Sequence, residues 1–149
     1  MKTMRVLASA LTIAAAAAPA IAGDLLYDKT QGEEILSEFH GRPYWEMQAY
    51  CAGFHGATAN YWAKRGESAR SKAAELSGVA AFGRAVAQIR RDRGIDENGA
   101  VKAVEPAVQV GGRVTTQALR EDGTISSGKW NYWRSFCIDA DAAFVRAAR

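Results

Sequence analysis

Apolar side chains recur in alternating steps of three and four residues along most of the chain, which is the spacing of a helix face in a bundle. The longest such pattern runs from Pro43, which suits the start of a helix, to Arg65, just before the helix-ending Gly66. Its predicted apolar seam is Tyr44, Met47, Cys51, Phe54, Thr58 and Tyr61. We take this helix as the element around which the remaining helices assemble.

Three more helices follow from the same spacing. One spans Glu67 to Arg93, ends in a cationic turn before Gly94, and has the predicted core face Ala69, Ala73, Leu76, Val79, Phe82, Val86 and Ile89. A further helix is capped by Asp96 and reaches about Arg120. The last helix starts at Ser126 or Ser127 and has the predicted seam Trp130, Trp133, Cys137, Ala140, Phe144 and Ala147.

The stretch Val108–Thr115 allows two interpretations. Its alternation around Gly111-Gly112 is typical of a small hairpin, but apolar residues also fall there at helical spacing. The helical surroundings favour a helix, since an isolated hairpin is marginally stable. Pro106 precedes this stretch and removes a helical hydrogen bond, so we expect a kink or a break near Glu105.

These elements predict an all-α fold, an up-down four-helix bundle with a short N-terminal helix from Thr30 to Gly41 and one inter-helix disulfide. Cys51 and Cys137 are the two cysteines, and both lie in a predicted seam. In an oxidising compartment we expect them to pair, with free thiols or an intermolecular bridge as the alternatives.

The expected disulfide sets the register of the first and last long helices. If Cys51 faces Cys137 and the helices are antiparallel, facing residue numbers sum to 188. Phe54 then meets Trp133, and Tyr44 meets Phe144. Small residues also recur along the first long helix, and its two mid-helix glycines, Gly53 and Gly56, suggest that another backbone comes close there.

Residues 1–22 have the pattern of a secretory signal peptide. Lys2 and Arg5 precede the apolar run Val6–Ala18, and a small-x-small motif ends at Ala22. The run is shorter than a membrane span, which makes an uncleaved anchor the less favoured alternative. We therefore expect one helical-bundle domain over residues 23–149, located in the periplasm or secreted.

Loss of the signal changes the charge of the chain. The net charge of +3 falls to +1, from 17 basic and 16 acidic residues, because the signal holds two basic and no acidic residues. A nearly neutral exported domain gives no basis for nucleic-acid binding. We expect no stable membrane insertion after cleavage.

Few residues have the spacing that metal binding, haem binding or catalysis requires. Cys51 and His55 are four apart, as are Cys137 and Asp141, but a disulfide would consume both sulfurs, so we predict no metal site. No Cys-x-x-Cys-His is present for covalent haem, although non-covalent haem on His55 stays open. Asp96-x-Asn98-Gly99 matches part of a calcium loop, and a helix cap explains it as well. We predict no catalytic residues.

Aromatic side chains are the remaining signal. Trp45, Tyr61, Trp62, Trp130, Tyr132 and Trp133 exceed what one seam requires. They could complete the core, or form an exposed patch that binds a partner protein, glycan or apolar ligand. The candidate ligand- or partner-binding residues are His55, Tyr61, Trp62, Trp130, Trp133 and Arg134.

The stretch Tyr50-Cys51-Ala52-Gly53-Phe54 resembles the Tyr-Cys-x-Gly-aromatic stretch of small periplasmic immunity proteins that neutralise secreted amidase-type toxins. Those proteins are similarly exported, helical and disulfide-bonded. The likeness is confined to this stretch, and the other cysteines of that family are missing here. It implies an inhibitor of another exported protein and transfers no site residue.

Together these patterns predict an exported, non-catalytic helical-bundle protein with a binding or structural role and no cofactor. The alternatives are a periplasmic immunity-type protein inhibitor and a bundle that carries a small ligand, haem or a metal. Another exported protein is the expected partner, and the oligomeric state is left open.

Overall fold

The structure is a computed structural model that describes residues 23–27, 39–122 and 128–147. Its four helices are α1 (Tyr44–Ala63), α2 (Ser68–Arg93), α3 (Glu97–Asp122) and α4 (Gly128–Ala147). The all-α bundle expected from the sequence is confirmed. The expected short N-terminal helix and the cap at Ser126 or Ser127 lie almost entirely outside the described residues. None of the described helices is both long and apolar enough to cross a membrane.

The helix ends follow the predicted signals. Pro43 is the N-cap of α1, and Gly94 ends α2 in the left-handed conformation that glycine favours, with φ +63°. Asp96 caps α3, because its Oδ1 accepts a hydrogen bond from the Gly99 N–H at 2.7 Å. This cap explains Asp96 without a bound calcium ion.

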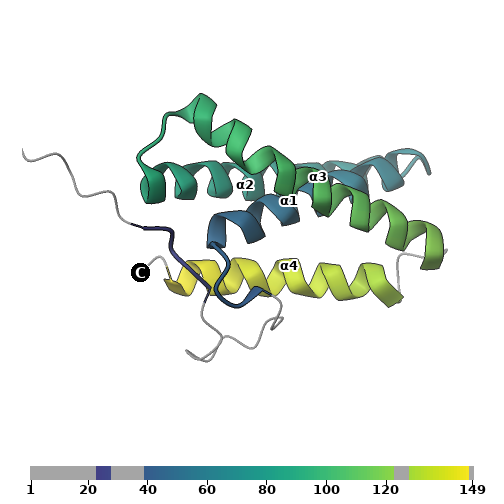
Figure 1. Ribbon diagram of the computed structural model, residues 1–149. Coiled ribbons are helices and arrows are strands. Elements are labelled where there is room, and N and C mark those ends of the chain that lie inside the picture. Colours follow the sequence, from purple (N-terminus) through teal and green to yellow (C-terminus); the bar gives the residue numbers. More distant parts are fainter. Residues whose placement is uncertain (1–22, 28–38, 123–127, 148–149) are drawn as a thin grey trace, which may run out of the picture.

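Helix α1 is the hub of the bundle (Figure 1). It runs between α2 and α4, while α3 crosses it, and its most extensive contacts are with α2 and α3. Its first half is buried on every side rather than along the single seam expected. Buried residues there include Tyr44, Trp45, Met47, Gln48, Ala49, Tyr50, Cys51, Ala52, Gly53 and Phe54.

Glycines bring the backbones of α1 and α3 together. A Cβ atom on Gly53 would clash with the carbonyl oxygen of Val108 and lie 2.6 Å from the Gly112 nitrogen. A Cβ on Gly111 would lie 2.9 Å from the carbonyl carbon of Tyr50. The predicted close backbone approach is confirmed at Gly53.

Helix α3 continues without interruption through Pro106, so the helical interpretation of 108–115 is confirmed and the hairpin is wrong. The break that was one of the two expectations near Glu105 is absent from this helix, and a kink there stays a prediction. Packing of α3 against α1 is the physical reason, since tertiary contacts outweigh the local loss of one hydrogen bond.

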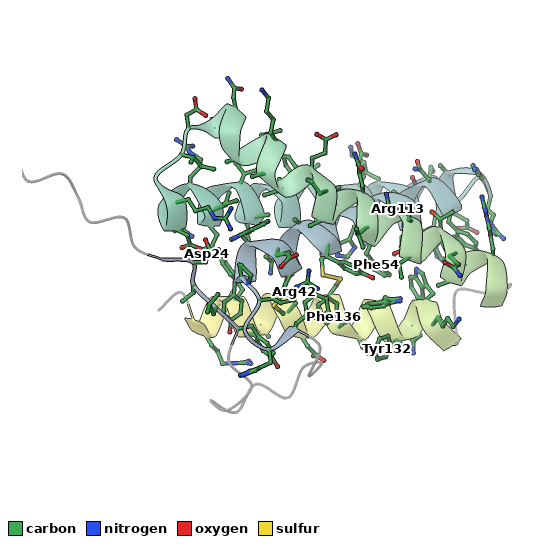
Figure 2. All side chains as sticks on the ribbon, in the orientation of Figure 1. Asp24, Arg42, Phe54, Arg113, Tyr132 and Phe136 are labelled. Atoms are coloured by element: carbon green, nitrogen blue, oxygen red, sulfur yellow. A yellow bond between two sulfur atoms is a disulfide. The ribbon has the colours of Figure 1, made fainter. Side chains whose placement is uncertain are left out.

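The disulfide between Cys51 and Cys137 joins α1 to α4, with 5.5 Å between the two Cα atoms, as predicted. Figure 2 shows this bond between the two helices. Tyr44 meets Phe144, with 6.2 Å between ring centroids, which confirms the register at that end. At the other end the register expectation is wrong, because Phe54 packs on Trp130 rather than on Trp133, at 5.7 Å. The expected pairing assumes that α1 and α4 stay in register along their whole length, and beyond the disulfide they do not.

The predicted core face of α2 is wrong in its first half. Leu76 and Val79 are 58% and 66% exposed, and Ala69 and Ala73 are also exposed. Helix α2 packs on α1 through smaller side chains that spacing of large aliphatics does not reveal. Its buried residues are Gly78, Ala81, Ala85, Val86, Gln88, Ile89 and Asp92.

Residues 23–27 form an extended strap across the ends of α1 and α2. The buried Asp92 carboxylate accepts the Leu25 N–H at 3.1 Å, and Asp24 pairs with Arg93 through two hydrogen bonds of 2.9 and 2.8 Å. Tyr27 is fully buried and packs edge-on against Tyr44. The strap therefore closes one end of the core.

Candidate functional site

A groove lies on the surface where α1, α2 and α4 meet, and we call it the aromatic–arginine groove. Its volume is about 540 Å³, within the range of ordinary ligand sites. Helix α1 forms its floor, while α2 and α4 form opposite walls. The lining residues are Phe54, His55, Thr58, Trp62, Arg70, Ala73, Ala74, Ser77, Trp130, Arg134 and Ile138.

Two aromatic side chains of the groove are held in place by contacts with α1. Phe54 points toward α4 (Figure 2) and stacks obliquely on Trp130, whose indole N–H donates to the Thr58 hydroxyl at 3.0 Å. Trp130 is therefore buried and its polar atom is satisfied. Its side chain is therefore held in one position and forms a rigid part of the groove wall.

Trp62 presents a more accessible ring near the end of α1. It is half-buried, and the Arg70 guanidinium lies over its face at 4.6 Å. Such a cation–π contact orders both side chains at the rim. Ile138, 53% exposed, adds apolar surface on the α4 wall.

The charges that line the groove are cationic. Arg70 and Arg134 contribute positive charge, and no carboxylate is among the described lining residues. Arg70 has an exposed contact of 3.9 Å with Glu67, which is a weak pair. Within the described part of the chain, Arg134 makes no ion pair. An anionic group that enters the groove would therefore meet two available guanidinium groups.

His55 lies half-buried on the groove floor. Burial lowers the pKa of its imidazole below the ordinary value of 6.5, and nearby Arg84 lowers it further, while Asp141 acts in the opposite direction. The ring is therefore neutral at pH 7. A neutral imidazole offers one hydrogen-bond donor and one acceptor to a bound molecule.

Arg84 connects the three helices that form the groove. Its Nε donates to the buried Gln48 side-chain oxygen at 2.9 Å, and its terminal nitrogen donates to Asp141 Oδ1 at 2.7 Å. These bonds run from α2 to α1 and from α2 to α4. Because α2 and α4 otherwise touch little, this side chain fixes the spacing of the two walls.

Four of the six candidate residues predicted from the sequence come together here, namely His55, Trp62, Trp130 and Arg134. The other two, Tyr61 and Trp133, do not line this groove, and their role in binding stays a prediction.

Tyr61 lies under the Arg65 guanidinium at 3.5 Å, beside the last turn of α1. Trp133 packs against Tyr50 at 5.0 Å and Phe136 at 5.8 Å.

Sequence reasoning missed Arg70. This arginine lies one turn before Ala73 and Ala74 and two turns before Ser77, so all four share one face of α2. Hydrophobic spacing predicts a core face through Ala69 and Ala73 here, which gives Arg70 no role. The signal that could have identified Arg70 is a cation on a helix face otherwise made of small residues.

Metal-ligating side chains do not cluster in the part of the chain that the structure describes, where no group of three His, Cys, Asp or Glu residues lies together. Both sulfurs are committed to the disulfide. The aromatic–arginine groove itself holds one histidine and hydroxyl groups of Thr58 and Ser77. This arrangement suits recognition by shape, apolar contact and charge.

The stretch that resembles immunity proteins is buried throughout. Tyr50, Cys51, Ala52, Gly53 and Phe54 are all buried in the hub helix. They supply the disulfide, the close approach of α3 and aromatic packing. The shared residues thus belong to the packing of the fold and present little surface to a partner.

No family model, no curated protein and no solved structure matches this chain in comparisons of its sequence and fold with known proteins.

Proposed function

We propose that this protein is a non-catalytic binding protein. In the aromatic–arginine groove it binds a segment of another exported protein that combines acidic residues with aromatic or aliphatic ones. The observation that carries the proposal is the pairing of apolar side chains with Arg70 and Arg134 in a groove lined by no described carboxylate. Tryptophan and arginine are also the residue types that contribute most to protein interfaces.

The groove chemistry supports a specific orientation of the bound segment. Apolar side chains of the segment would rest against Trp62 and Ile138, which lose water-exposed area on binding, with the buried Trp130 behind them. Carboxylates of the segment would pair with the guanidinium of Arg134, which can bind a carboxylate through two parallel hydrogen bonds. Helical walls fixed by Arg84 keep this arrangement pre-organised.

An inhibitor of immunity type is one form of this activity. The resemblance of residues 50–54 to that family supports it through the fold alone, since those residues are buried. In this form the groove receives an acidic loop of the toxin.

Export of the chain is part of the same proposal. The signal-like residues 1–22 support it, and the disulfide is of the kind that persists in oxidising compartments such as the periplasm or the extracellular space. Mass spectrometry of the secreted protein tests it by locating the mature N-terminus, expected at Gly23.

The binding activity is tested with a displayed library of random peptides selected on the oxidised protein. We expect enrichment of peptides in which aspartate or glutamate flanks aromatic or aliphatic residues, with a change of tryptophan fluorescence on binding that Trp62→Phe reduces. Arg134→Glu should weaken a selected peptide about tenfold or more, because it replaces an attractive charge pair by a repulsive one. Arg146→Glu, the same change elsewhere on α4, is the matched control and should bind normally.

Two results would count against this function. Selected peptides that bind Arg134→Glu and the parent protein equally well would place binding outside the groove. Purified secreted protein with haem-like visible absorbance, or with stoichiometric bound metal, would instead support a ligand-carrying bundle that uses His55.

A further inference from the structure

A second groove opens on the other side of α1, between α2 and α3, and we call it the α2–α3 groove. It consists of two hollows of about 810 and 470 Å³ that share Ala52, Gly56, Asn60 and Val108 in their linings. The C-terminal half of α1 forms its floor. The bundle is thus open where a further helix would complete the layer around α1.

The space beside Gly56 on this floor is open within the described chain, although the Gly56 nitrogen lies near Gly78 of α2. A Cβ atom built on Gly56 would meet no described atom within 4 Å, whereas a Cβ on Gly53 would collide with α3. A glycine in a helix interior costs about 1 kcal/mol relative to alanine. At Gly53 the close contact with α3 offsets that cost, whereas at Gly56 no described atom occupies the space that a side chain would fill.

An exposed apolar ridge runs along α2 beside this groove. Val79 and Leu76 are the most exposed of the large hydrophobic residues described, at 66% and 58%. Gly83 continues the same face four residues after Val79, and a Cβ there would also meet no described atom within 4 Å. Val79 itself lines the groove, so ridge and groove are directly adjacent.

We propose that the α2–α3 groove is a dimerisation surface that receives the Leu76–Val79–Gly83 ridge of a second copy of this chain. A ridge and a groove that lie side by side on one molecule are self-complementary under a twofold axis, since each copy then offers its ridge to the groove of the other. Gly56 and Gly83 let the two helix backbones approach closely, as Gly53 and Gly111 do between α1 and α3.

The charges around the groove fit the same partner. Arg113 and Arg120 line the α3 side and make no ion pair within the described residues. On the α2 side, Glu75 lines the smaller hollow. Its carboxylate forms an exposed ion pair with Lys72, with 2.9 Å between the charged atoms. A second α2 laid into the groove brings its own Glu75 toward these unpaired arginines. This adds an attractive contact at the rim, where such pairs favour correct docking.

The oligomeric state of the oxidised mature protein tests the proposal directly, by sedimentation and native mass spectrometry over a wide concentration range. We expect a dimer whose melting temperature rises with protein concentration. Val79→Asp should abolish the dimer by placing a charge in the apolar contact, and Gly56→Leu should abolish it by filling the groove. Both changes point into open space, so circular dichroism of the dilute monomers should match the parent protein.

Val145→Asp is the matched control, because Val145 is 50% exposed on α4 near the opposite end of α1. It should leave the dimer intact, as should Arg134→Glu in the aromatic–arginine groove. A parent protein that stays monomeric up to its solubility limit overturns the proposal. A dimer that survives Val79→Asp and Gly56→Leu, or that Val145→Asp disrupts, also overturns it. None of these readouts depends on peptide binding.

Discussion

The Val108 carbonyl oxygen of α3 occupies the space that a Cβ atom on Gly53 of α1 would need. The two helices therefore touch backbone to backbone, and the obstructing atoms cannot move without moving α3. Overpacking of a core typically costs about 1–3 kcal/mol. We predict that Gly53→Ala lowers the free energy of unfolding by at least this amount. Denaturant unfolding of the oxidised protein measures this change.

Gly56→Ala provides the comparison for Gly53→Ala. Both changes add one methyl group to the same helix three residues apart, but the methyl group at residue 56 enters open space. At concentrations low enough to keep the chain monomeric, Gly56→Ala should stabilise the protein by about 1 kcal/mol through helix propensity. Equal effects of the two substitutions would refute the close approach of α1 and α3.

The disulfide should contribute much of the stability of the fold. It joins residues 86 apart, and in the chain-entropy account such a loop stabilises the folded state by roughly 4–5 kcal/mol. Cys51→Ser should lower the melting temperature to that of the reduced parent protein. Reductant should then have no further effect on the variant. A parent protein whose melting temperature is insensitive to reductant would contradict this expectation.

Stability should fall with acidity in a window set by His55. Burial lowers the pKa of His55 in the folded state below its ordinary value of 6.5, so the unfolded chain binds the proton first as pH falls. The free energy of unfolding should therefore decrease as pH drops below about 6.5, until the folded state also takes up the proton. His55→Gln should remove this part of the pH dependence. Denaturant titrations from neutral pH downward compare the two proteins.

A second loss of stability is expected at lower pH from Asp24. The Arg93 hydrogen bonds hold the pKa of that carboxyl below its ordinary value of 3.8, so its contribution is present above that pH and is lost below it. The pair is partly exposed, so the effect should be small. Asp24→Asn should show a smaller loss of stability in this acid range than the parent protein shows.

The strap depends on Asp92. This buried carboxylate accepts hydrogen bonds from the Leu25 N–H and, at 2.6 Å, from the Gln88 amide. Asp92→Ala leaves both donors without this partner, which we expect to cost about 1–3 kcal/mol. Hydrogen exchange should accelerate at the amides of Leu25 and of Tyr44, whose N–H donates to the Leu25 carbonyl. Unchanged exchange at Leu25 would show that the strap is held by other contacts.

The sequence predicted the elements of this fold well because their signals are local. Helix limits followed from caps such as Asp96 and Gly94, and the disulfide and the Tyr44–Phe144 contact followed from the seams of two helices. The close approach at Gly53 was also predicted, since a mid-helix glycine needs a reason. Gly56 lies near Gly78 of α2, but the space that its own side chain would fill is open within the described chain.

The face of α2 was predicted wrongly because hydrophobic spacing gives most weight to large side chains. Helix α2 packs through Gly78, Ala81 and Ala85, whose small size allows α1 to come close, while Leu76 and Val79 stay exposed. Neither groove could be predicted from the sequence. They arise from how far the helices separate along α1, which depends on long-range packing rather than on local pattern.

The central position of α1 has a consequence for how the chain acquires its structure. Synthesis proceeds from the N-terminus, so α1 is made before any of the helices that cover it. Its aromatic residues Tyr44, Tyr50 and Phe54 pack against rings of α4, so those contacts form only once α4 has been made. Cys51 likewise pairs with a residue 86 positions later in the chain. The strap at residues 24 and 25 likewise waits for Asp92 and Arg93. The core can therefore close only after α4 has been synthesised.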